Sequence, residues 1–81
     1  MSPEQIEEMY DRIELDLVLV TEWIEGAGEP ADLLMLLEIQ QVARDGIDQA
    51  ARGLLDRFSG AEIGRAIGVS RQAVHNRWVS R

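Results

Sequence analysis

Two helix start signals lie within a dozen residues of each other near the end of the chain, with a glycine between them. Ser59 can cap a helix, because Glu62 follows three residues later and completes a capping box. Gly68 can end that helix in the left-handed conformation, which glycine adopts without strain. Ser70 can then cap a second helix that begins at Arg71. The segment therefore predicts two short helices joined by a tight turn.

Apolar and polar side chains in this segment recur at helical spacing. Ile63 and Ile67 lie four residues apart and would share one face of the first helix. Gly64 would let the two helices approach closely. The side chains expected to form the core are Ile63, Ile67, Val69, Ala73, Val74 and Trp78. The polar side chains left for the outer face of the second helix are Arg71, Gln72, His75, Asn76 and Arg77. Side chains of these types can reach base edges in the major groove of DNA.

Residues 59–79 resemble the helix-turn-helix of small bacterial regulators, resolvases and region 4 of sigma factors. In that family the phrase E-I-G-x-A-x-G-V-S-R-x-x-V recurs, and the residues from Glu62 to Val74 match every fixed position of it. The resemblance covers about twenty of the 81 residues, and the first half of the chain resembles no family that we recognise. It implies DNA binding by a tri-helical domain in which a preceding helix packs behind the pair. Some helix-turn-helix units bind proteins instead, so the fold alone does not determine the target.

The residues predicted to contact DNA differ in what they would bind. Arg71 and Gln72, in the first turn of the second helix, are placed to reach guanine and adenine edges. Contacts to phosphates are expected from Ser70, Arg65, Arg77 and Arg81. His75 and Asn76, one turn later, could reach bases or phosphates. The alternative for each residue is a polar side chain that is only solvated.

Acidic residues outnumber basic ones, 15 to 8, and give a formal net charge of −7, whereas DNA-binding proteins are usually basic. Residues 1–40 carry eleven carboxylates against Arg12, a net charge of −10. Residues 57–81 carry five arginines against Glu62, a net charge of +4. The Debye length at physiological salt is about 8 Å, so a phosphate at the basic end would be screened from distant carboxylates. We expect the acidic half to weaken binding to random DNA without preventing binding to a specific site.

Two long helices are predicted for the first half of the chain. Ser2 and Gln5 form another capping-box pattern, with Pro3 at the first helical position. An apolar stripe follows at spacings of three and four: Ile6, Tyr10, Ile13, Leu17, Val20 and Ile24. Alternation over residues 13–20 would also fit a strand, but the stripe runs through it and no partner strand is evident. Residues 26–30 end this helix, and a second helix is expected from about Ala31 to Arg57, with a potential kink at residues 45–46.

The predicted fold class is therefore all-α, with a long N-terminal helical hairpin that leads into a C-terminal helix-turn-helix. Residues 1–57 would form the acidic hairpin, and residues 58–81 would pack on the end of the second helix. The core stripe expected along that helix is Leu36, Ala43, Ile47, Ala50, Leu54 and Phe58. A second stripe on a neighbouring face is Met35, Ile39 and Val42.

Five consecutive apolar residues, 33–37, leave no polar side on the start of the second helix. A helix that is apolar all round must be covered all round, and this short chain offers little to cover it. We therefore expect a homodimer in which the N-terminal hairpins pair. The expected interface residues are Ile13, Leu17, Val20, Trp23, Ile24, Leu33, Met35, Leu36, Leu37 and Ile39. The alternatives are that this surface folds back on the monomer or binds a different protein.

Other classes of protein fit the sequence poorly. The chain has no cysteine and one histidine, so neither a disulfide framework nor a zinc site is expected. No catalytic residue set, phosphate-binding glycine loop, cofactor site, secretory signal or membrane-spanning run is evident. We expect a cytoplasmic, nucleoid-associated protein from a bacterium, phage or plasmid.

The function predicted from the sequence is that of a small homodimeric transcriptional regulator that reads a pseudo-palindromic site in double-stranded DNA. The alternative is an adaptor or inhibitor whose acidic half binds RNA polymerase, a sigma factor or another basic partner. Mimicry of DNA by the acidic surface has less support, because its carboxylates follow no phosphate-like spacing.

Overall fold

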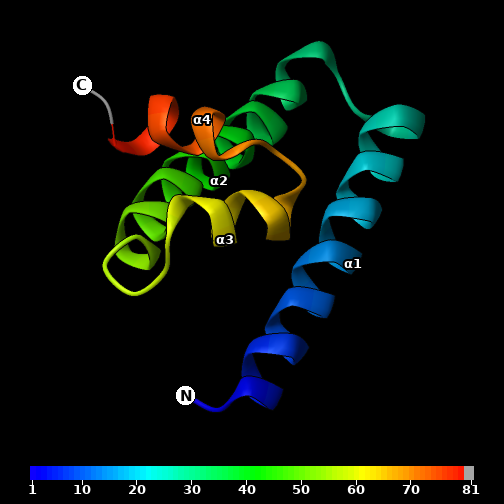
Figure 1. Cartoon of the computed structure of the whole chain (residues 1–81). Coiled ribbons are helices and arrows are strands. Elements are labelled where there is room, and N and C mark those ends of the chain that lie inside the picture. Colours follow the sequence, from blue (N-terminus) through cyan, green and yellow to red (C-terminus); the bar gives the residue numbers. More distant parts are fainter. Residues whose placement is uncertain (80–81) are drawn as a thin grey trace. The chain divides into compact units, whose positions relative to one another are not determined.

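Helices form every regular element in the computed structural model, which describes residues 1–79 (Figure 1). In chain order they are α1 (Pro3–Ala27), the 3₁₀-helix η1 (Pro30–Asp32), α2 (Leu33–Leu54), α3 (Gly60–Ile67), α4 (Arg71–Val74) and the π-helical turn η2 (His75–Val79). The predicted all-α class is confirmed, and residues 13–20 lie within α1. The chain divides into two compact units, Met1–Leu37 and Glu38–Arg81, which meet within α2.

Capping groups and a glycine set the ends of α1, as predicted. The Ser2 hydroxyl oxygen accepts a hydrogen bond from the Gln5 amide at 3.2 Å, and the Gln5 side chain accepts one from the Ser2 amide at 2.8 Å. At the other end the Gly28 amide donates to the Ile24 carbonyl at 3.0 Å. A Cβ at Gly28 would lie 2.7 Å from the Ile24 Cα, so only glycine fits this close return of the chain. The Glu29 amide then donates to Asp32 at 2.8 Å, which opens η1 ahead of α2.

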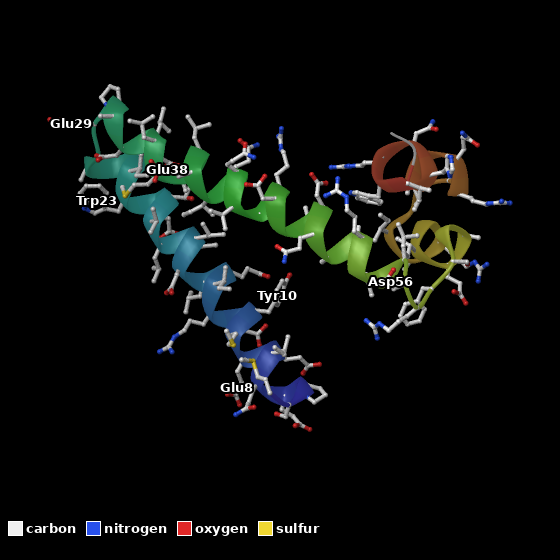
Figure 2. All side chains as sticks on the ribbon, turned by 90° about the vertical axis from the view of Figure 1, so that its left-hand side faces the viewer. Glu8, Tyr10, Trp23, Glu29, Glu38 and Asp56 are labelled. Atoms are coloured by element: carbon white, nitrogen blue, oxygen red, sulfur yellow. The ribbon has the colours of Figure 1, made fainter. Side chains whose placement is uncertain are left out.

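No side chain in the apolar stripe of α1 is fully buried in the single chain, and half of them are exposed. No residue of α1 is buried, and only Leu17, Val20 and Ile24 of the stripe are half-buried. Figure 2 shows the side chains along α1, with Tyr10 and Trp23 labelled; they are 63% and 54% exposed. The first unit therefore does not form a closed hydrophobic core with its own residues.

Carboxylates crowd the polar side of α1 and give it a negative potential. A hydrogen bond to the Glu14 carboxylate, together with repulsion by the charges of Glu14 and Asp11, raises the pKa of the Tyr10 phenol above 10.0. Ten carboxylates against Arg12 give residues 1–37 a net charge of −9.

The second unit has a small core to which four helical segments contribute. Ala51 of α2, Ile63 of α3, Val74 of α4 and Trp78 of η2 are buried together. Leu54 and Leu55 are half-buried against this cluster. The end of α2 thus packs against the α3–α4 pair (Figure 1).

Several side chains expected in this core are exposed instead. Phe58 and Ile67 are 44% and 57% exposed, because they line an open apolar groove between the end of α2 and α3. The Val69 side chain is 42% exposed, whereas the Val69 backbone packs against Gly64. The Val69 carbonyl faces Gly64, and the Val69 amide donates to the Gly64 carbonyl at 2.8 Å. Ala73 is exposed, since one residue along a helix turns the side chain by about 100° from the buried Val74.

The second helix also differs from its predicted form. It runs from Leu33 to Leu54 without a break at residues 45–46 and ends three residues before Arg57. Its buried residue is Ala51, whereas Ala43, Ile47 and Ala50 of the predicted stripe are exposed. The face of α2 that was predicted to be buried therefore differs from the face that contacts α3 and α4. A turn follows at Asp56, which is labelled in Figure 2.

Gly64→Ala is expected to lower the free energy of unfolding by about 1–3 kcal/mol, the usual cost of overpacking. The added Cβ would lie 2.6 Å from the Val69 carbonyl oxygen, a backbone atom that cannot rotate away. Gly46→Ala is the matched control, because it lies in α2 and the added Cβ would meet nothing within 4 Å beyond its chain neighbours and the backbone of its own helix. It should stabilise the helix by about 0.5–1 kcal/mol. Urea unfolding followed by circular dichroism measures both; equal stability of Gly64→Ala and the parent would contradict the close approach.

Candidate nucleic-acid interface

Local hydrogen bonds fix both ends of α3, as the sequence predicted. The Ser59 hydroxyl oxygen accepts from the Glu62 amide at 3.1 Å, and the Glu62 carboxylate accepts from the Ser59 amide at 2.8 Å. Gly68 ends the helix with φ 79° and ψ 28°, the left-handed conformation. It is the one residue with positive φ among those that the structure describes. The direction in which the chain leaves α3 thus depends on this glycine.

Ser70 starts the next helix through its side chain. Its hydroxyl oxygen accepts a hydrogen bond from the Ala73 amide at 3.0 Å. The hydroxyl hydrogen is not used by this cap, so the same group can still donate to an acceptor such as a phosphate oxygen.

The segment formed by α4 and η2 has one buried side and one exposed side. Val74 is 0% and Trp78 8% exposed, and these residues are four apart on the face that meets the core. The polar residues predicted to face outward are all exposed: Arg71, Gln72, His75, Asn76 and Arg77. Ser70, Arg71, Gln72 and His75 together line a shallow polar recess. The structure therefore brings four of the predicted contact residues together around one recess.

The side-chain amides of Gln72 and Asn76 are hydrogen-bonded to each other. The Gln72 side-chain nitrogen donates to the Asn76 side-chain oxygen at 3.0 Å, one helical turn away. This bond leaves the Gln72 carbonyl oxygen and one of its N–H groups free. An acceptor and a donor side by side match the N6 and N7 edge of adenine.

The arginines predicted to contact phosphates are placed differently from one another. The Arg77 guanidinium lies 5.0 Å from the centroid of the Trp78 ring, within the range of a cation–π interaction. Arg65 is exposed on α3. Arg81 lies outside the described residues.

Sequence reasoning missed one side chain of this unit, Asp48 of α2. Its carboxylate accepts a hydrogen bond from the Trp78 indole nitrogen at 2.9 Å, across thirty residues of sequence. No sequence signal pointed to it, because Asp48 lies on the side of α2 marked by Ala51, whose burial becomes evident only in the packed structure. A carboxylate near a buried tryptophan can satisfy the indole donor, which usually has a partner when buried.

The residues predicted at a dimer interface are accessible in the single chain. Leu17, Val20, Ile24 and Leu36 are half-buried. The others are exposed: Ile13, Trp23, Leu33, Met35, Leu37 and Ile39. All except Ile39 belong to the unit formed by residues 1–37.

Residues 1–79 contain no cluster of acidic or histidine side chains that could hold a metal ion. None of the helices in this range is both long enough and apolar enough to cross a membrane.

No protein-family model, no curated protein and no solved structure matches the chain.

Ser70→Ala is expected to lower the free energy of unfolding by about 1 kcal/mol, because it removes the side-chain cap of α4. Ser70→Asp is the control, since aspartate caps helices as well as serine does and should keep the parental stability. Thermal unfolding of the three proteins measures the difference. Equal stability of Ser70→Ala and the parent would mean that this cap does not stabilise the folded unit.

Proposed function

We propose that the chain is a sequence-specific DNA-binding protein that places α4 and η2 in the major groove. The observation that carries the proposal is the division of this segment into a buried side, Val74 and Trp78, and an outer side of exposed polar residues. The cap–glycine–cap geometry at Ser59, Gly68 and Ser70 supports it, because a groove-reading helix must be presented at a fixed angle.

In this proposal the exposed residues have different roles in DNA recognition. Arg71 pairs with guanine and Gln72 with adenine, in the bidentate geometries that these side chains allow. Ser70, Arg65 and Arg77 bind phosphates and set the register, while His75 and Asn76 lie one turn further along the groove. Residues 57–79 carry four arginines against Glu62, so the local charge favours the phosphate backbone although the whole chain is acidic. The proposed role is binding and regulation rather than catalysis, in the cytoplasm and at the nucleoid.

The proposed active species is a homodimer joined through the apolar surface of the first unit. Thirteen large apolar side chains of residues 1–37 are exposed in the single chain, and such surfaces mark interfaces in most proteins. A twofold pair would present two reading helices to half-sites about 34–36 Å apart, one turn of DNA. Transcriptional regulation at a pseudo-palindromic site follows from this arrangement.

A second candidate function is favoured by the charge of the first unit. A net charge of −9 beside exposed apolar side chains fits a basic protein partner, such as RNA polymerase or a sigma factor. In that case the reading helix would deliver the partner to DNA or have no DNA target.

Selection of random duplexes by the purified protein, followed by sequencing of the bound fraction, tests the main proposal. We expect an enriched inverted repeat with half-site centres one DNA turn apart. Folded protein that enriches no sequence would contradict DNA reading and favour the basic protein partner.

Replacing Arg71 and Gln72 together by alanine is expected to weaken binding to the selected duplex at least about 30-fold. The estimate takes the lower end of about 1–3 kcal/mol for each bidentate base contact. The double variant Gln40→Ala and Arg44→Ala is the matched control: it removes the same side-chain types, four residues apart, from the exposed surface of α2. Fluorescence anisotropy with a labelled duplex measures both. Parental affinity of the first variant would exclude these two residues from base reading.

Leu37→Glu is expected to shift the protein from dimer to monomer, because it places a charge in the proposed apolar interface. Ile67→Glu is the control, since both side chains are 57% exposed and Ile67 lies on α3, outside that interface. Sedimentation equilibrium gives the masses. A monomeric parent, or a Leu37→Glu variant as dimeric as the parent, would contradict the proposed pairing.

A further inference from the structure

One side-chain hydrogen bond connects α2 to the end of the proposed reading segment. It joins the Trp78 indole nitrogen to an oxygen of Asp48 at 2.9 Å and spans thirty residues of sequence. Trp78 is 8% exposed and Asp48 is half-buried, so water competes little for the donor. A carboxylate acceptor makes this bond stronger than a bond between neutral groups.

The same indole ring also contacts the arginine nearest to it in sequence. The Arg77 guanidinium lies 5.0 Å from the ring centroid, and the Arg77 side chain is exposed. The ring is thus held at its edge by Asp48 and offers a face to Arg77. Such a contact at an exposed site is weakly attractive, so the position of the ring biases the position of the guanidinium.

Both residues lie in the π-helical turn η2 (His75–Val79). A π-helical turn is wider than an α-helical turn and rarely persists without a local reason, often a functional one. The turn begins directly after Val74, which the core holds at 0% exposure. Beyond Val74, Trp78 is the buried residue of η2, so its contacts determine where this turn lies against α2.

We propose that Asp48 is a positioning residue for DNA binding. Through Trp78 it fixes η2 against α2 and holds the Arg77 guanidinium where that group meets a phosphate. This inference rests on the proposed function and adds to it a residue that does not itself contact DNA. Groups that bind a ligand need such support to keep their geometry.

Binding to the selected duplex, measured over a series of salt concentrations, tests the inference. Each phosphate contact contributes about 0.9 to the slope of log K against log salt. Arg77→Ala should therefore lower the slope by about 0.9, and Asp48→Ala should lower it equally. The double variant should show no further loss, because both changes remove one contact. Simple partial unfolding would weaken binding by a similar factor at every salt concentration and leave the slope unchanged.

Three further variants separate the hydrogen bond from other effects. Asp48→Asn keeps an acceptor and should retain the parental slope. Trp78→Phe keeps a buried ring and removes the indole donor, so it should lower the slope as Asp48→Ala does. It serves as the test variant if Asp48→Ala does not fold. Asp45→Ala removes a carboxylate from the exposed surface of the same helix and should leave the slope unchanged.

The outcomes distinguish this inference from the proposed function. If the parent binds no duplex, the proposed function fails and the inference fails with it. If the parent binds and Arg77→Ala lowers the slope while Asp48→Ala and Trp78→Phe do not, only the role of Asp48 is overturned. Additive losses in the Asp48→Ala and Arg77→Ala double variant would overturn it as well.

Discussion

The burial of Val74 and Trp78 against α2 and α3 is the contact on which the rest of the second unit depends. These two side chains are four residues apart, so burying them fixes both the position and the rotation of the last helical segment. Once that rotation is fixed, Gln72 and Asn76 must face outward, since they lie on the remaining arc of the helix. Arg71, three residues before Val74, is exposed in the first turn of α4. The proposed reading surface is therefore a consequence of the core. The hydrogen bond between Trp78 and Asp48 fixes η2 against α2 in the same way.

Features that depend on a few neighbouring residues could be predicted from the sequence. The capping boxes at Ser2 and Ser59 and the cap at Ser70 involve groups three residues apart, whose chemistry determines their geometry. The left-handed Gly68 belongs to the same class, because φ is a property of one residue. The outward face of the segment formed by α4 and η2 could also be predicted, because helical periodicity places it opposite the two apolar residues Val74 and Trp78.

Features that depend on tertiary contacts could not be predicted in the same way. Ile67 has the right spacing from Ile63 for the core, but it lies in the last turn of α3 beside an open groove. The buried face of α2 centres on Ala51 rather than on the longer apolar stripe, because only its last turns meet α3 and α4. Spacing indicates which residues share a face, whereas only the packed structure indicates which face is covered. The acceptor role of Asp48 is of this second kind.

The two units impose opposite requirements that a dimer would reconcile. If the proposed function holds, an acidic first unit would disfavour random DNA, and a segment with few arginines would make only a few phosphate contacts, so one copy alone would bind weakly. Joining two copies makes the second half-site contact effectively intramolecular, which raises the affinity for a paired site without any new contact. Random DNA has no second half-site at the right spacing, so the affinity of the dimer for it does not increase comparably. On this reasoning the negative charge of the first unit increases specificity, provided that its apolar surface holds the two copies together.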